Sequence, residues 1–266
     1  MQEYVHGYTE REATRLNDQA NALDRLLHND SVWPKGSLIL EAGCGVGAQT
    51  RIIAPNNPYS QFISVDISEQ SINQAINLIS GLNIKNTAFK QGDIFNLPFD
   101  NNYFDHVFVC FVLEHLSDVP AALTELRRVL KPDGTIMAIE GDHGSTYFYP
   151  DSSEAKEAIQ CQVILQKQNG GDANIGRRLY PLLKESGFQD VRISPRMVYV
   201  DDSKPELVEG FTKNTFTAMI EGIADDAIEK KLTSPEKMAK GIHDLHQTAT
   251  GGGTFCYTFF KGFGKK

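Results

Sequence analysis

The sequence is poor in cysteine, and its cysteines form no pattern typical of a zinc site or a disulfide framework. Four cysteines occur in 266 residues: Cys44, Cys110, Cys161 and Cys256. None belongs to a C-x-x-C pair and none lies near a histidine at metal-ligand spacing, which argues against a zinc centre. Isolated thiols in a chain of this size are typical of a reducing compartment. We therefore expect a cytoplasmic protein without a site metal.

Excess positive charge and long apolar runs are also missing. The formal net charge is −8, which argues against broad contact with a nucleic-acid backbone. The adjacent pairs Arg127–Arg128 and Arg177–Arg178 are interpreted as solvated helix faces. No apolar stretch is long enough to span a bilayer, and the first residues contain no apolar signal region. These features predict a soluble protein that acts on neither nucleic acids nor membranes.

What is present is an alternation of strand-like and helix-like segments, typical of a parallel sheet covered on both faces. Thr9 and Glu12 form a capping-box pair that predicts an N-terminal helix. After the break at 33–36, the predicted strands are Ser37–Glu41, Gln61–Asp66, Thr87–Lys90, His106–Phe111 and Thr135–Glu140. The predicted helices between them are Ala48–Ala54, Glu69–Leu82 with Ser68 as N-cap, and Val119–Leu130.

The rhythm changes after this core. Further helices are predicted over Ser152–Gln168, Ile175–Ser186 and Pro205–Ile223, followed by a polar helical segment to about His246, and further strands over Val191–Val200 and Thr254–Lys261. No clean linker interrupts the chain. We therefore expect one domain, with an N-terminal helical cap (1–36), a cofactor-binding core (37–150), and lid helices with the final strands (151–266).

A glycine loop, Glu41-Ala-Gly43-Cys-Gly45-Val-Gly47, follows the first strand and opens a helix. Glycines allow a tight turn and close approach to a ligand. Taken alone the loop is ambiguous, because Gly43, Gly45 and Ala48 also satisfy a dinucleotide-binding pattern. Asp66, at the end of the second strand, can bind the ribose hydroxyls of a cofactor, whether or not that cofactor is a dinucleotide.

A second acid, Asp93, ends the third strand, where a carboxylate can accept from an adenine amine. Ile67 and Ile94 supply apolar faces for the ring. The alternative is that Asp66 and Asp93 only cap their strands.

Five motifs carry a family resemblance: EAGCGVG, VDIS, QGDIFNLPF, FDHVFVCFVLEHL and LRRVLKPDGTIMAIE. In this order over Ser37–Glu140 they resemble class I methyltransferases, which use S-adenosylmethionine, and in particular the small-molecule branch similar to the ubiquinone and menaquinone enzymes. The resemblance implies a Rossmann-like, doubly wound α/β fold: a mostly parallel seven-stranded sheet with an antiparallel last strand, assigned to Gly253–Lys261. The family core lacks the stretch Asp201–Gly253, which we predict to be a substrate lid.

The resemblance also implies the cofactor contacts. Glu41 and the loop residues Gly43, Cys44, Gly45 and Gly47 would hold the methionine end, Asp66 the ribose with Ile67 against the adenine, and Asp93 and Ile94 the adenine edge and face. Cys110 and Phe111 would lie near the sulfonium, and His115 either contacts the cofactor or shapes the site. Tyr8 and Arg11 either close over the cofactor or are solvated helix residues.

For the substrate side, Glu140–Ser145 is expected to leave the fifth strand as a loop at the carboxyl edge, where ligands bind in such folds. Within it His143 is the best candidate for a general base, beside Asp142; the alternative is a structural histidine bonded to Asp142. Residues 147–149 are expected either to line an aromatic pocket or to pack on the core. Arg196 is expected in an internal ion pair rather than against an acidic substrate group.

The leading hypothesis is therefore an enzyme, a monomer or homodimer, that methylates an oxygen, nitrogen or carbon of a small molecule by in-line displacement. A non-catalytic protein that binds S-adenosylmethionine is the alternative. A nicotinamide-dependent oxidoreductase is less favoured, because its site requires neither Glu41, nor Asp93, nor the LKPDG turn. Asn214 and His243 are weaker candidates for lid residues that contact the substrate.

Overall fold

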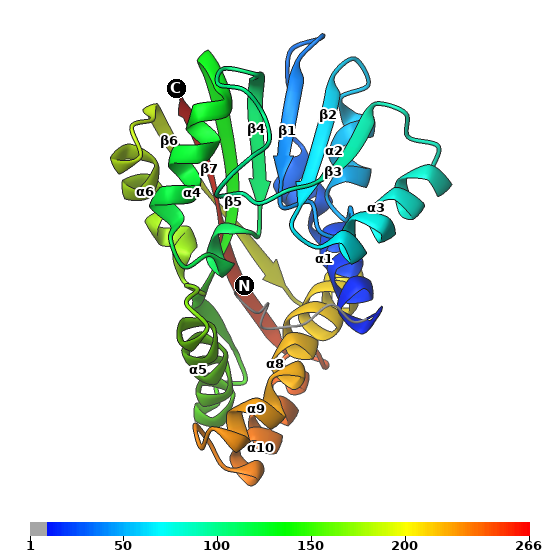
Figure 1. Ribbon diagram of the computed structural model, residues 1–266. Coiled ribbons are helices and arrows are strands. Elements are labelled where there is room, and N and C mark those ends of the chain that lie inside the picture. Colours follow the sequence, from blue (N-terminus) through cyan, green and yellow to red (C-terminus); the bar gives the residue numbers. More distant parts are fainter. Residues whose placement is uncertain (1–9) are drawn as a thin grey trace.

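Seven strands form one sheet in the order β3-β2-β1-β4-β5-β7-β6 (Figure 1). The computed structural model describes residues 10–266, with side chains from Thr14 onward. The strands are β1 (Leu38–Ala42), β2 (Gln61–Asp66), β3 (Thr87–Gln91), β4 (Phe104–Cys110), β5 (Leu130–Tyr149), β6 (Gln189–Val200) and β7 (Thr254–Lys265). β7 runs antiparallel to β5 and β6, and the other neighbouring pairs are parallel. The predicted Rossmann-like α/β sheet with one antiparallel strand is confirmed.

Helices lie on both faces of this sheet and below its carboxyl edge. They are α1 (Glu10–His28), α2 (Thr50–Asn56), α3 (Glu69–Gly81), α4 (Val119–Val129), α5 (Ser153–Gln168), α6 (Leu179–Glu185), α7 (Pro205–Leu207), α8 (Ala218–Gly222), α9 (Ala224–Glu229) and α10 (Pro235–Gln247), with 3-10 turns η1 (Leu113–His115) and η2 (Ile175–Arg178) and a π-helix η3 (Val208–Thr217). The predicted cap of α3 is confirmed, because Ser68 accepts a hydrogen bond from the Ser71 amide at 3.1 Å.

Side-chain alternation in the central strands divides the core into two layers. Ile39 in β1 and Phe108 in β4 pack with residues of α1 and α2. Their neighbours Leu40 and Val107 point to the opposite face and pack with α4 and α6. Strands covered on both faces in this way read as continuous apolar runs, which is why they are recognisable in the sequence.

β5 is much longer than predicted, and the expectation of a loop over Glu140–Ser145 is wrong. The strand continues to Tyr149 because β7 offers an antiparallel partner, with an irregularity between Asp142 and Tyr147. Phe148 is buried, whereas Tyr147 and Tyr149 are exposed, as alternation along a strand requires. Residues 147–149 therefore do not form an aromatic pocket.

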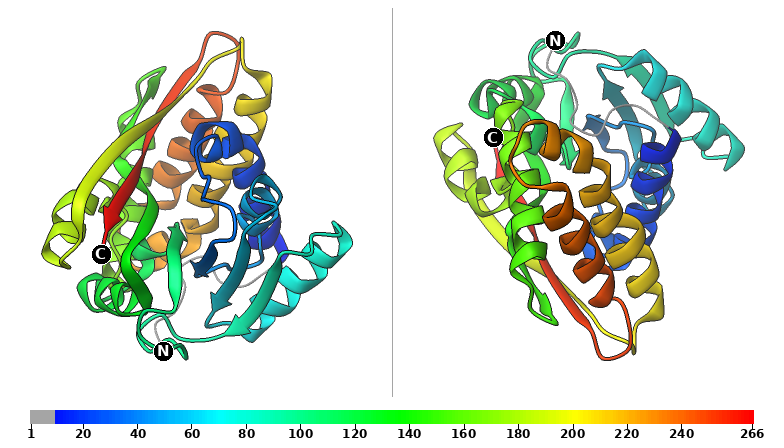
Figure 2. Two further views of the ribbon diagram at one scale, coloured as in Figure 1. Left: turned by 90° about the horizontal axis from the view of Figure 1, so that it is seen from above. Right: turned by 90° about the horizontal axis from the view of Figure 1, so that it is seen from below.

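The long strands β5, β6 and β7 extend beyond the carboxyl ends of β1 and β4, and the helices α5, α8, α9 and α10 lie at this end of the molecule (Figure 1). Seen from below, α5, α10 and η3 lie side by side across this edge of the sheet (Figure 2). The main apolar core therefore continues into this end of the molecule. Its members there include Phe211, Phe216, Ile220 and Ile223.

The segment predicted as one helix over Pro205–Ile223 is divided into α7, η3 and α8. Phe211 and Phe216 both contact β7, at 6.0 Å and 4.8 Å between their ring centroids and that of Phe255. Five residues are more than one α-helical turn, so a regular α-helix would turn these rings to different sides. The wider π turn keeps both on the face that meets β7, and π segments are often found at functional sites.

Two further features concern charge and hydropathy. The predicted internal ion pair of Arg196 is confirmed: its guanidinium binds the Asp30 carboxylate after α1, which also binds the Lys261 ammonium at 2.5 Å. In the part of the chain that the structure describes, no helix combines the length and apolar character needed to cross a bilayer. Nor does any group of three or more His, Cys, Asp or Glu side chains from residue 14 onward have the arrangement of a metal site.

Candidate active site

The glycine loop joins β1 to α2 at the carboxyl edge of the sheet. Gly43 has a φ of +76°, and a Cβ there would lie 2.5 Å from a Val112 methyl carbon, so a side chain does not fit. Gly45 also has a positive φ, of +52°, yet a Cβ at this position would meet no described atom within 4 Å. The loop is thus tightly packed behind Gly43 and open in front of Gly45, which leaves room for a ligand against the backbone.

Glu41, the last acid of β1, is fully buried behind the loop. Its Oε2 accepts hydrogen bonds from the Thr50 hydroxyl at 2.7 Å and the Ser64 hydroxyl at 2.6 Å. Its Oε1 is buried and has no hydrogen-bond partner among the described residues. Burial, reinforced by the nearby Asp66 carboxylate, raises the pKa of Glu41 to about 7. A buried acceptor of this kind is suited to a cationic group that arrives with a ligand.

Asp66 ends β2 beside the loop. Its Oδ2 accepts from the Gly45 amide at 2.8 Å, and its Oδ1 accepts from the Ser68 amide at 2.9 Å. Burial raises the pKa of this carboxyl. Each oxygen keeps a further lone pair, so the carboxylate can accept two hydroxyl donors while the two amides hold it in place.

Asp93, after β3, is exposed, and its Oδ1 accepts from the Phe95 amide at 2.9 Å. Ile67 is 48% exposed beside Asp66, and Ile94 is half-buried beside Asp93. Two apolar side chains therefore follow two acids along the carboxyl edge, as the sequence predicted for the adenosine end of a cofactor.

The end of β4 forms the next part of the edge. Cys110 is buried, and burial raises the pKa of its thiol well above the usual range. Phe111 has a φ of +57°, an uncommon conformation for a bulky residue and one often found at binding sites. The turn after it is held by Glu140, whose Oε1 accepts from the amides of Val112 at 3.1 Å and Leu113 at 2.8 Å.

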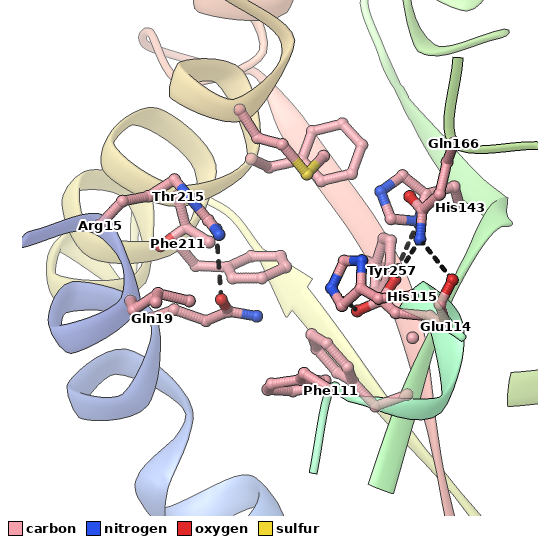
Figure 3. Close-up of a pocket in the computed structure, with 15 residues that line it drawn as sticks. Arg15, Gln19, Phe111, Glu114, His115, His143, Gln166, Phe211, Thr215 and Tyr257 are labelled. Atoms are coloured by element: carbon pink, nitrogen blue, oxygen red, sulfur yellow. Dashed lines mark hydrogen bonds and ion pairs between the residues drawn. The ribbon is translucent and has the colours of Figure 1, made fainter. Parts of the chain in front are cut away.

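A cavity lies beyond the end of β4, between the helical elements α1, η1, η3 and α5 and the strands β5 and β7 (Figure 3). Its empty volume is about 550 Å³, including space open to solvent. The residues that line it are Arg15, Leu16, Gln19, Phe111, Glu114, His115, Gly141, His143, Gln166, Phe211, Thr215, Phe216, Met219, Tyr257 and Phe259. Arg15, Gln19 and Thr215 lie on one side, and Glu114, His143 and Gln166 lie opposite (Figure 3). The cavity therefore has an aromatic body with polar groups at both ends.

His143 lies in β5 at the wall of this cavity and is buried. Its Nδ1 is 3.0 Å from the Ala173 carbonyl oxygen and 3.1 Å from the Tyr257 hydroxyl oxygen. Its Nε2 is buried and has no hydrogen-bond partner within residues 10–266. Burial lowers the pKa of His143, only partly opposed by the charge of Glu114, so the ring is neutral near pH 7.

Asp142, the neighbour of His143 in β5, points to the other side of the strand. Its two oxygens accept from Arg177 Nε at 2.7 Å and from Arg177 Nη2 at 2.6 Å. Arg177 is exposed in η2, as predicted for a solvated helix residue, but its guanidinium also pairs with this buried carboxylate, which the sequence did not indicate. Asp142 does not line the cavity, and the bonds of the His143 ring go to other residues.

The remaining predicted residues are placed as follows. His115 lines the cavity in η1, with its Nε2 3.7 Å from the Glu114 carboxylate. Tyr8 and the side chain of Arg11 lie outside the described residues. Asn214 and His243 are exposed and do not line the cavity.

Sequence reasoning missed the groups on the far wall of the cavity. Glu114 accepts from Gln166 Nε2 at 3.2 Å, which joins η1 to α5, and Tyr257 comes from β7. Their sequence contexts, an acid after a strand, a glutamine in a helix and a tyrosine in a strand, are common in any α/β protein. Only Glu114, inside the motif FVCFVLEHL, offered a local signal.

The comparisons with known proteins agree with this geometry. Residues 40–138 match the model of a methyltransferase domain family. The chain is 35% identical over 172 residues to a demethylmenaquinone methyltransferase of Lactobacillus johnsonii, covering 60% of this chain and 70% of that protein. It is 34% identical over 151 residues to an uncharacterised methyltransferase of Schizosaccharomyces pombe, covering 54% of each.

A solved structure of phosphoethanolamine N-methyltransferase 2 from Haemonchus contortus, in complex with phosphomonomethylethanolamine and S-adenosylhomocysteine, has a TM-score of 0.55 and 17% identity, covering 92% of this chain and 52% of that one. The chain belongs to the class I methyltransferases, which use S-adenosylmethionine as cofactor. It spans about half the length of several curated relatives that it matches, at 54%, 62% and 44%.

The residues present fit this cofactor. The unpartnered Oε1 of Glu41 is suited to the ammonium of the methionine end, the open side of Gly45 to its backbone atoms, and Asp66 to ribose hydroxyls.

Proposed function

We propose that this protein transfers the methyl group of S-adenosylmethionine to an oxygen, nitrogen or carbon of a small molecule held in the cavity of Figure 3. The observation that carries the proposal is the position of His143. A neutral imidazole with an unpartnered Nε2 lines an aromatic cavity, into which Phe111 extends from the cofactor edge of the sheet.

Bound S-adenosylmethionine would supply a methyl group made electrophilic by its sulfonium. The task of the chain is to hold both reactants in line and to exclude water, and orientation of this kind contributes on the order of 7–11 kcal/mol. Phe211, Phe216 and Met219 line the cavity on the side of the proposed lid. Phe111 and Phe259 also line it, and the centroids of these two rings are 5.5 Å apart.

His143 is proposed as the general base. Its neutral ring would take up, at Nε2, the proton that the acceptor group loses on methylation, and would later release that proton to solvent. The nearby Glu114 carboxylate favours the charged ring by electrostatic attraction. A base of this kind contributes about 10²–10⁴-fold to the rate when the acceptor must lose a proton. Asp142, bound to Arg177, is not used.

The cavity supports a substrate with a ring-bearing or otherwise apolar body and an O–H or N–H group directed at His143. Five aromatic side chains form its body: Phe111, Phe211, Phe216, Tyr257 and Phe259. The Lactobacillus johnsonii relative is by name a demethylmenaquinone methyltransferase, which is consistent with a ring compound as the acceptor.

The test is a screen of small ring compounds carrying hydroxyl or amine groups, with S-adenosylhomocysteine formation as the readout. For an active compound, His143→Ala should reduce turnover about 10²–10⁴-fold while leaving cofactor affinity unchanged by calorimetry. His243→Ala, on the exposed face of α10, is the matched control. Unchanged turnover in His143→Ala would show that His143 is not the general base. Tight cofactor binding without turnover of any compound would favour a regulatory protein instead.

A further inference from the structure

We propose that Tyr257 is a positioning residue that, together with the Ala173 carbonyl, fixes the proton of His143 on Nδ1 and so leaves Nε2 free to act as a base. This inference rests on the proposed function, because it explains how His143 is made ready for that role. Tyr257 lies in the last strand, more than a hundred positions after His143 in the sequence, and acts through its hydroxyl group.

The carbonyl of Ala173 is the first of two oxygens that favour a proton on Nδ1 of the ring. A carbonyl oxygen can only accept a hydrogen bond. Ala173 O lies 3.0 Å from Nδ1, and a hydrogen bond between these two atoms requires the proton to be on Nδ1. The same carbonyl accepts from the His143 backbone amide, also at 3.0 Å, so its position is set by the β5 backbone itself. The neutral ring then carries its lone pair on Nε2, at the cavity wall.

Tyr257 supplies a second oxygen at the same nitrogen. Its hydroxyl oxygen lies 3.1 Å from Nδ1, and the two rings meet edge to face at 5.6 Å between centroids. Burial and the surrounding acids raise the pKa of Tyr257 well above its usual range, so the phenol stays protonated and neutral. A neutral phenol oxygen keeps lone pairs, so it can accept from Nδ1 in the tautomer that the Ala173 carbonyl favours. The same bond is stronger when the ring gains a positive charge.

Gly141 makes this approach possible. It lies two residues before His143 in β5, and a Cβ at this position would overlap the Tyr257 hydroxyl oxygen. Its φ is not in the left-handed region, so the backbone does not require glycine there. The absence of a side chain is instead explained by the space that the hydroxyl occupies, which links the two residues in one arrangement.

The charges that surround the ring belong to several elements. Glu114 and His115 face it from η1, Asp142 adjoins it in β5, and Tyr257 lies beside it in β7. The carboxylates favour the protonated ring, whereas burial and His115 disfavour it. Removal of the Tyr257 hydroxyl takes away an acceptor of the protonated ring without changing any of these charges. The pH at which His143 titrates should then fall.

The first experiment measures the tautomer directly, in the protein without substrate. In protein labelled with ¹⁵N-histidine, the His143 ring signals are assigned as those lost in His143→Ala. Nitrogen shifts should place the neutral ring's proton on Nδ1 in the wild type. In Tyr257→Phe a measurable fraction should move to Nε2, while Tyr149→Phe, which removes an exposed hydroxyl, should match the wild type. A proton on Nε2 in the wild type would overturn the inference.

The second experiment is the pH profile of kcat/KM with an active acceptor. Tyr257→Phe should lower kcat roughly tenfold and shift the acidic limb of the profile to lower pH by about one unit. Gly141→Ala, which displaces the hydroxyl but retains Tyr257, should shift it in the same direction. A fall in kcat with an unmoved limb in both variants would mean that Tyr257 only fills space. Loss of the base proposal is recognised separately, as full turnover in His143→Ala.

Discussion

Replacement of Glu41 by glutamine tests how the buried carboxyl behind the glycine loop contributes to cofactor binding. Its pKa lies at about 7 rather than the ordinary 4.5. A difference of about 2.5 units corresponds to roughly 3 kcal/mol against ionisation in the folded protein, at about 1.4 kcal/mol per unit. Glu41→Gln keeps an oxygen that can accept from Thr50 and Ser64 but removes the ionisable group.

The effect on stability has a definite sign. Below about pH 4.5 the carboxyl is protonated in both the folded and the unfolded chain and carries no penalty. Between about pH 4.5 and about 7 it ionises only in the unfolded chain, so it lowers stability increasingly up to about pH 7. Relative to the wild type, Glu41→Gln should therefore gain about 1–3 kcal/mol between pH 5 and pH 8 in urea unfolding. Glu206→Gln, at an exposed position, is the control.

The effect on binding follows from the unpartnered Oε1. A cofactor ammonium placed there should favour the ionised carboxylate, so binding at pH 7 should release about half a proton, and almost none at pH 8.5. Calorimetry in two buffers with different ionisation enthalpies measures this release. In Glu41→Gln the release should disappear and affinity should fall about 10–100-fold. No proton release by the wild type, together with undiminished affinity of the variant, would refute the assignment of Glu41 to the ammonium.

Three further predictions concern the site and its support. Asp66→Ala should weaken cofactor binding at least about tenfold by calorimetry, because it removes the ribose acceptor; wild-type affinity would remove Asp66 from this role. Gly43→Ala should destabilise the fold by about 1–3 kcal/mol in urea unfolding, whereas Gly81→Ala in α3, with open space around it, should be nearly neutral; equal effects would contradict the steric account of the loop. Arg177→Ala should lower the free energy of unfolding by about 2 kcal/mol in the same measurement, less than for a fully buried pair because Arg177 is half exposed. Asp142→Asn added to this variant should recover part of the loss; no recovery would show that the buried Asp142 charge is not its cause.

Much of the fold could be predicted because its signals are local. β2 follows from its short, mostly apolar run, and α3 from the Ser68 cap, which bonds only three residues away. The extension of β5 could not be predicted, since Gly141–Ser145 resembles a loop until β7, more than a hundred residues later, supplies its hydrogen-bond partner. The π turn of η3 likewise depends on packing against Phe255, and no residue near η3 in the sequence indicates this contact.

The same division applies to the site. Glu41, Asp66 and Asp93 belong to motifs that lie next to strand ends, so their place on the carboxyl edge follows from chain order. The cavity wall is assembled from α1, η3, α5 and β7, and its key contact joins His143 to Tyr257 across 114 positions. Such contacts depend on tertiary packing, so the sequence could indicate His143 but not its partners.

A crystal structure with S-adenosylhomocysteine would test the central claim most directly. We expect the ribose hydroxyls on Asp66, the ammonium beside Glu41 Oε1, and the sulfur near Phe111 with an open path to the cavity that His143 lines. A sulfur sealed off from that cavity, or a cofactor bound away from the glycine loop, would contradict it.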